Sequence, residues 1–149
     1  MQSPRALTCV LLVALAAAPL PAQAPETRTA RLTPAPLEAA TFEQLAGASG
    51  SVTATLTGTT LTVAGAFTGL RSPAASATLH AAAPGLRGPV LATLALDGAA
   101  AGTITGEVAL TDVQAGYFRD EWLYIQLHND DYPDGLLRGW LVVPEAPTP

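Results

Sequence analysis

Residues 123–141 read LYIQLHNDDYPDGLLRGWL, and this stretch decides the fold. A first run over 123–128 and a second over 137–143 alternate core-type side chains with polar or aromatic ones. Alternation with a period of two is typical of a strand that buries one face. Between the runs, residues 129–135 combine asparagine, aspartate, proline and glycine, which favour a turn. The stretch therefore predicts a β-hairpin whose core-facing positions are Leu123, Ile125, Leu127, Leu137, Gly139, Leu141 and Val143.

The same alternation recurs in short segments upstream of this hairpin. The predicted strands are 41–45, 51–57, 60–67, 75–80, 90–96 and 103–110. Gly58 and Thr59 favour a tight turn that joins two of these strands into another hairpin. Turn signals return every 8 to 12 residues or so, which is typical of an antiparallel all-β sandwich or barrel. We expect seven or eight short strands in one domain.

A short helix is predicted near residues 112–119. Thr111 provides a side chain of the kind that caps a helix N-terminus. Asp112 adds a negative charge that the helix dipole favours at that end. Gly116 weakens the middle of the segment, so we expect only one or two turns that end near Arg119.

The first part of the chain, 1–24, has the pattern of a secretory signal peptide. Arg5 supplies the positive charge, residues 6–18 form an apolar run, and residues 22–24 form an A-x-A cleavage site. The run is too short to span a bilayer. Cys9, the single cysteine, lies inside this segment. We therefore predict an exported chain, periplasmic or secreted, without a disulfide in its mature form.

The remaining residues divide into three predicted parts. Residues 25–40 contain several prolines and no apolar period, which indicates an extended, mobile tether. Residues 41–143 form the β domain. Residues 144–149 form a disordered tail.

Acidic residues dominate the charge of the chain. Twelve aspartates and glutamates outnumber seven arginines, there is no lysine, and the net charge is −5. An acidic chain without a basic cluster is poorly suited to nucleic acid or to anionic lipid. We therefore predict no nucleic-acid partner, no membrane insertion after signal cleavage and no cofactor.

Several separate motifs resemble one family. They are Leu79-His80, residues 85–90 (GLRGPV), Leu110-Thr111 with Gln114, residues 124–128 (YIQLH), residues 133–135 (PDG) and Arg138-Gly139. In this order and spacing they resemble the CHRD domain, the module named after chordin, whose terminal motif reads approximately Y-V-N-V-H-T and then P-x-G-E-I-R-G-Q-L. The likeness covers residues 51–142. It implies an immunoglobulin-like β-barrel or sandwich that serves as an extracellular or envelope binding module, not an enzyme.

The chain departs from the family pattern at polar positions. Thr78 stands where the family has the first histidine of its H-I-H segment, and Gln126 replaces the family's asparagine. Leu136 and Trp140 replace a glutamate and a glutamine. The apolar, fold-bearing pattern is thus kept while the polar positions differ.

Aromatic residues and an arginine gather near the predicted C-terminal hairpin and form a candidate binding patch. Its residues are Trp122, Tyr124, His128, Arg138 and Trp140. Tryptophan, tyrosine and arginine are enriched at binding hot spots. Two alternatives remain open: Arg138 ties the Asp-rich turn by charge-assisted hydrogen bonds, or the rings form a second packed layer that binds nothing.

His80 and His128 are the only histidines, and alternation places both on the outer faces of their strands. With Asp130 and Asp134 they form a candidate metal site, because zinc and copper sites use three or four such ligands. The alternative is that each histidine bonds to the backbone of a loop.

No nucleophile motif such as G-x-S-x-G occurs, so we predict that the chain is not an enzyme. We expect an exported, non-catalytic module of bacterial type that binds another protein or a second copy of itself at the cell envelope. The alternative is an envelope module that binds metal through the two histidines and the Asp-rich turn.

Overall fold

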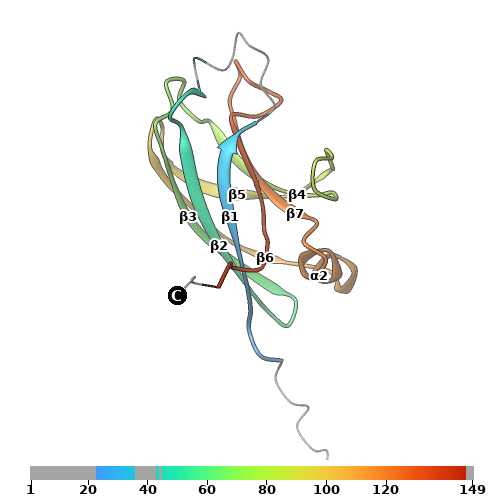
Figure 1. Ribbon diagram of the computed structural model, residues 1–149. Helices are drawn as coiled ribbons and strands as arrows, with labels where there is room; N and C mark the ends of the chain where they lie inside the picture. Colours follow the sequence, from blue (N-terminus) through green and yellow to red (C-terminus); the bar gives the residue numbers. More distant parts are fainter. Residues whose placement is uncertain (1–22, 36–42, 44, 147–149) are drawn as a thin grey trace, which may run out of the picture.

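The computed structural model describes residues 23–35, 43 and 45–146 (Figure 1). Most of the predicted signal peptide, 1–22, and the end of the predicted tail, 147–149, lie outside the described residues. No helix in the described part of the chain combines the length and apolarity needed to cross a bilayer.

Antiparallel strands form a closed barrel in this part of the chain. The labelled elements are β1 (Glu26–Pro34), β2 (Ser49–Thr57), β3 (Thr60–Thr68), β4 (Ser76–Ala81), β5 (Val90–Gly98), β6 (Gly102–Ala109), α2 (Asp112–Arg119), β7 (Leu123–His128) and β8 (Leu137–Trp140). The ring order is β1-β2-β3-β6-β5-β4-β7-β8. The prediction of an all-β fold with a short helix near 112–119 is confirmed, and the structure selects the barrel.

Period-two alternation explains the core of the barrel. Leu56, Leu61 and Ile125 are fully buried, whereas the threonines that alternate with the apolar residues of β2 and β3 are mostly exposed. Threonine is branched at Cβ and suits the solvated face of a strand. The core predicted for the last hairpin is confirmed except at Val143, which follows the end of β8 and is exposed.

The prediction of a mobile tether over 25–40 is wrong for Glu26–Pro34, which forms β1. This strand pairs with β2 from Glu26↔Leu56 to Leu32↔Gly50, and its Ala30 and Leu32 are buried in the core. The strand predicted at 41–45 falls mainly outside the described residues, and the two that are described, Glu43 and Leu45, are helical.

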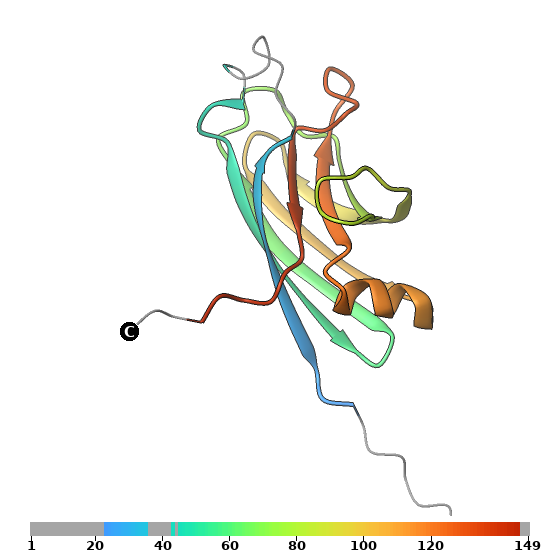
Figure 2. The same ribbon diagram turned by 45° about the vertical axis from the view of Figure 1, so that its right-hand side comes forward.

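β1 and β5 each change partner along their length, which closes the ring. β1 pairs with β2 and then, at Thr33 and Pro34, with β8. β5 pairs with β4 over 90–94 and with β6 over 95–98. Strands that pass from one partner to another in this way form the corners of a barrel. Figure 2 shows β1 and β8 side by side, so the first and last strands complete the ring.

Helix α2 follows β6 and covers one end of the barrel. Ala115 and Phe118 point into the core, and the Arg28 guanidinium of β1 lies 5.2 Å from the centre of the Phe118 ring. Thr111 caps the helix as predicted: its hydroxyl accepts from the Gln114 amide, and the Gln114 side chain accepts from the Thr111 amide. This reciprocal capping box fixes where the helix begins.

Candidate functional site

The outer face of β4, β7 and β8 carries a polar cluster made of two cross-strand rows. In antiparallel sheets, directly paired residues project from the same face. The pairs of β4 with β7 and of β7 with β8 therefore align His80 with Tyr124 and Trp140 in one row, and Thr78 with Gln126 and Arg138 in the next. We call the outer cluster these six residues and His128.

The first row is a stack of rings. The His80 ring lies parallel to the Tyr124 ring, with centroids 4.7 Å apart and an interplanar angle of 9°. The Trp140 ring lies 5.0 Å from Tyr124 at 41°. The Arg138 guanidinium lies 5.2 Å from the Tyr124 ring centre, within reach of a cation–π attraction. The rings therefore hold one another and the guanidinium in fixed positions.

Thr78 links the two histidines. The Gly88 carbonyl lies 3.0 Å from His80 Nδ1, so this nitrogen donates and carries the proton of the neutral ring. His80 Nε2 then accepts from the Thr78 hydroxyl at 2.8 Å. That hydroxyl has only one proton, so at its other contact, 2.6 Å from His128 Nε2, it accepts.

The hydrogen-bond chain continues to Arg138. His128 Nδ1 lies 3.2 Å from Gln126 Nε2, which donates to it and also donates to the Asp134 carbonyl at 3.1 Å. Gln126 Oε1 accepts from Arg138 Nε at 2.5 Å. Each residue in this chain of hydrogen bonds thus donates to the next one. The order from first donor to last acceptor is Arg138, Gln126, His128, Thr78, His80 and Gly88. In this order both histidines are neutral. Protonation of His128 would instead make its Nδ1 a donor to the Pro133 carbonyl, which lies 3.3 Å away, and would end the bond from Gln126.

The charges of the outer cluster agree with this arrangement. Burial is the main cause that lowers the pKa of His80 and of His128, and the nearby charge of Arg138 lowers both further. Burial also lowers the pKa of Arg138, although a guanidinium remains charged in proteins. The cluster therefore contains two neutral histidines and one buried cation at neutral pH.

Two loops cover the outer cluster. The β4–β5 loop supplies the Gly88 carbonyl to His80 and the Ala82 carbonyl to the Trp140 indole N–H at 3.0 Å. The β7–β8 loop supplies the Asp134 carbonyl to Gln126. Arg87 and Asp134 tie the two loops together by an exposed ion pair of 2.5 Å, which contributes little to stability.

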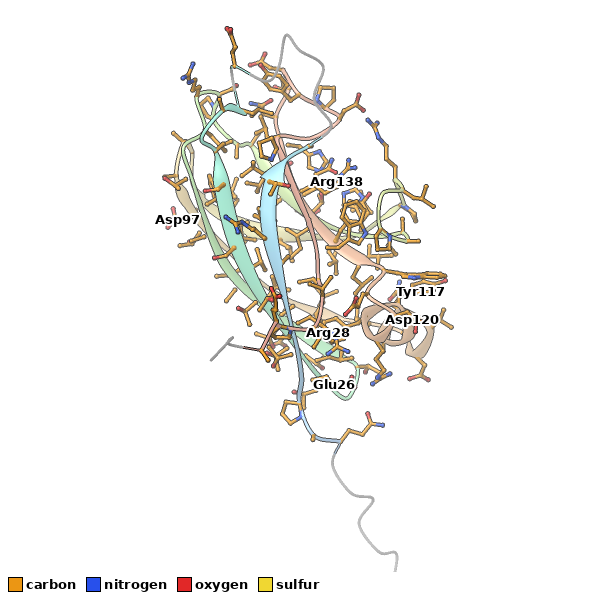
Figure 3. All side chains as sticks on the ribbon, viewed as in Figure 1. Glu26, Arg28, Asp97, Tyr117, Asp120 and Arg138 are labelled. Carbon is orange, nitrogen blue, oxygen red and sulfur yellow. The ribbon has the colours of Figure 1, made fainter. Side chains whose placement is uncertain are left out.

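The five residues of the predicted binding patch do not form one exposed surface. Tyr124 is buried, Arg138 is only 8% exposed, and His128 and Trp140 are half-buried. Trp122 is 42% exposed and stacks on Tyr117 of α2. Figure 3 shows Arg138 beside the upper part of β7 and Tyr117 lower down on α2.

Arg138 does tie the Asp-rich turn, as the first alternative expected. Its Nη2 donates to the Asp134 carbonyl at 3.4 Å, and its Nε reaches the same turn through Gln126. Asn129 organises the rest of the turn, because its side chain accepts from the Tyr132 amide and donates to Ser72 and Pro73.

The predicted metal site is not assembled. His80 and His128 do approach each other, with ring centroids 5.7 Å apart, but Thr78 bonds to the Nε2 atom of each. Asp134 pairs with Arg87, and Asp130 is exposed. Within residues 23–35, 43 and 45–146, no three histidine, cysteine, aspartate or glutamate side chains gather closely enough to hold a metal ion.

The Thr78 hydroxyl has the separation from a histidine that a nucleophile and its base would have. It is only 9% exposed, however, and its oxygen is enclosed by both histidine rings. The Thr78 hydroxyl is therefore part of a hydrogen-bonded network and is not open to a substrate.

Sequence reasoning missed Thr78 and Gln126 as parts of this site. In the sequence both stand out only as departures from the family pattern, yet they make the connections between His80, His128 and Arg138. Their spacing could have indicated them: Thr78 lies two residues before His80, and Gln126 lies two residues before His128, so each shares the outer face of its strand with a histidine.

The fold and the outer cluster define a closed antiparallel β-barrel module whose outer polar network is covered by two loops. The family model of the CHRD domain matches residues 28–141, so the chain belongs to the CHRD domain family, whose members are generally non-enzymatic modules. The match begins inside β1, in agreement with its place in the barrel. Searches of curated proteins and of solved structures return no significant match.

Proposed function

We propose that this chain is an exported, non-catalytic CHRD module that binds a protein partner, or a second copy of itself, at the cell envelope. The proposed contact is the α2 surface, which consists of Val113, Tyr117 and Trp122. The observation that carries it is the exposed Trp122 ring, 5.8 Å from the Tyr117 ring and at 19° to it.

The α2 surface has the composition of a binding site. Val113 is 65% exposed and lies one helical turn from Tyr117, so the two side chains share a face of α2. Trp and Tyr are enriched at hot spots, and a ring that is already stacked loses little freedom on binding. Leu86, another exposed apolar residue, lies in the β4–β5 loop, which projects from the same side of the barrel as α2 (Figures 1 and 2).

Export supports a role outside the cytoplasm, in the periplasm or after secretion. The proposal that the chain is exported rests on the predicted signal peptide at 1–24. Fractionation of cells that express the full chain, with mass analysis of the mature N-terminus, tests this part directly. Uncleaved protein confined to the cytoplasm contradicts it.

The binding role is tested by capture from an envelope extract and by sedimentation velocity over a range of protein concentrations. Trp122→Ala is compared with Val142→Ala, which truncates another partly exposed apolar residue beside β1. We expect Trp122→Ala to lose the captured partner or the dimer and Val142→Ala to retain it. Equal binding by both folded variants would move the interface away from α2. Hydrolase or redox activity that disappears in the His80→Ala, His128→Ala double variant would contradict the non-catalytic role.

A further inference from the structure

Arg138 is a buried cation without a carboxylate partner among the described residues. The described ion pairs involve Arg28, Arg87 and Arg119, but not Arg138. Its hydrogen-bond acceptors are the neutral Gln126 side chain and the Asp134 carbonyl. Buried charges in proteins are normally paired. Burial lowers the pKa of Arg138 and the charge of the Asp134 carboxylate raises it, but this carboxylate forms its ion pair with Arg87 and not with Arg138.

The Arg138 side chain lines a pocket of about 230 Å³ where β1 meets β8. The other lining residues are Thr33, Pro34, Ala35, Gly85 and Trp140, none of which is acidic. Thr33 is the direct cross-strand partner of Arg138, so their side chains share the outer face of the barrel. The pocket is smaller than the roughly 300–1,000 Å³ of sites for drug-sized ligands, and it suits one small group.

We propose that this pocket binds a carboxylate group, with Arg138 as the counter-charge and Trp140 as the wall against which the ligand packs. A guanidinium has five N–H groups, and its bonds to Gln126 and Asp134 use two of them. The remaining groups match the planar, two-oxygen geometry of a carboxylate. The stacked rings of the outer cluster hold the guanidinium in place, so little ordering is needed on binding.

The ligand class follows from charge and size. One arginine neutralises a single negative charge, and the net charge of −5 opposes anions that carry more. Pro34, Ala35 and the Trp140 ring offer apolar contact to the body that carries the carboxylate. A peptide C-terminus and a uronic acid sugar both present this chemistry. The site is separate from the α2 surface, so either proposal stands if the other fails.

The fluorescence of Trp140 reports binding in this pocket. The chain has two tryptophans, so Trp122→Phe leaves Trp140 as the only one. The Trp122→Phe variant is titrated at constant ionic strength, and its tryptophan emission is measured. The ligands are sodium acetate, short acetylated peptides with a free C-terminal carboxylate, and glucuronate. The uncharged controls are the same peptides with a C-terminal amide, and glucose. We expect saturable changes with the free carboxylates and none with the amide or glucose. A peptide response that exceeds the glucuronate response identifies a chain end as the source, and the reverse identifies a sugar.

Thr33→Glu and Thr33→Gln are the decisive pair, because they leave Arg138 in place. A glutamate at position 33 supplies an internal carboxylate beside the guanidinium, so we expect the affinity for the free carboxylates to fall by roughly thirtyfold or more. The matched glutamine should retain binding. The absence of any saturable response, an equal response to the amides, or equal binding by the two variants would overturn the proposal.

Glu38 lies outside the described residues and is tested as an internal source of the counter-charge. Glu38→Gln is titrated with the same ligands. Unchanged binding supports a site for an external carboxylate. Binding that appears only in Glu38→Gln would show that the chain fills the pocket itself and would overturn the proposal.

Discussion

Gly139 sets how closely β8 approaches β1. A Cβ atom at this position would collide with the Arg31 carbonyl and lie 3.1 Å from the Leu32 side chain. The obstacle is backbone, which cannot turn aside as a flexible side chain does. We therefore expect Gly139→Val to lower the free energy of unfolding by about 1–3 kcal/mol in urea denaturation, because the seam of the barrel must open.

Gly116 of α2 is the matched control for this prediction. A Cβ atom there meets nothing within 4 Å, and alanine is favoured over glycine inside a helix. We expect Gly116→Ala to raise the free energy of unfolding by roughly 0.5–1 kcal/mol. Similar losses in both variants would mean that close approach at Gly139 is not the cause.

Thr78 connects the two histidines through one hydroxyl. Thr78→Val keeps the shape of the side chain but leaves His80 Nε2 and His128 Nε2 without their partner. We expect a loss of about 1–3 kcal/mol in the free energy of unfolding at pH 7.5, the cost of leaving a buried polar group unpaired. Thr78→Ser retains the hydroxyl and should lose less. Equal stability of the valine variant and the wild type would refute the hydrogen-bond chain.

The sequence was sufficient to place His80 and His128 on the outer faces of their strands, because alternation depends only on local order. It was not sufficient to give the register between strands. The pairing of Thr78 with Gln126, and of Gln126 with Arg138, comes from the packing of the whole barrel. For this reason the sequence predicts a metal site and a binding patch where the structure has a hydrogen-bonded network.

At the scale of elements, α2 depends on its N-terminal cap. The Thr111 hydroxyl accepts from the Gln114 amide at 3.2 Å, and the Gln114 side chain accepts from the Thr111 amide at 2.9 Å. We expect Thr111→Ala to reduce the free energy of unfolding by about 1 kcal/mol, because a first-turn N–H group loses its partner. Thr111→Ser should keep most of the wild-type stability. An alanine variant as stable as the serine variant would show that the cap contributes nothing.

β1 shows why one element was mistaken for a tether. Only Ala30 and Leu32 form a recognisable inward pair, because Arg28 occupies the preceding inward position and places its charge over the Phe118 ring. The adjacent prolines added a second misleading signal. Pro34 is accommodated at the end of the strand, where a missing N–H costs little. The hairpins were predictable because each forms its pairs locally, whereas β1 is defined by distant partners.

At the scale of the whole molecule, the structure predicts that β1 is required for folding. Deletion of 25–35 would leave β2 and β8 with open edges in place of a closed ring. We expect the shortened protein to show no cooperative unfolding transition by circular dichroism. We also expect it to associate, which size-exclusion chromatography would detect. Deletion of 147–149 is the control. A monomeric, cooperatively folded protein without 25–35 would restore the tether interpretation.

Stability should also depend on pH through the two histidines. Burial lowers the pKa of His80 and His128 in the folded state below the ordinary value of 6.5. As pH falls through about 6.5, the unfolded chain therefore binds protons before the folded chain does. The contribution of the neutral histidines is fully present above that pH and is lost on acidification.

We expect the free energy of unfolding to decrease below pH 6.5 with a slope of up to about 1.4 kcal/mol per pH unit for each histidine. Urea denaturation between pH 5 and 8 measures this slope. The His80→Gln, His128→Gln double variant should show a flatter profile. An equally steep profile in that variant would assign the dependence to other groups.

The order of strands in the ring also decides when the molecule can be completed. Among the described strands, β8 is synthesised last, and it closes the barrel against β1, which is synthesised first. Contacts between such distant segments form slowly, and an unpaired early strand is prone to join other chains. A chain that emerges from a ribosome N-terminus first therefore keeps the seam between β1 and β8 open until β8 has emerged. β1 can pair with β2 as soon as β2 emerges, but its end at Thr33 and Pro34 has no partner until β8 follows.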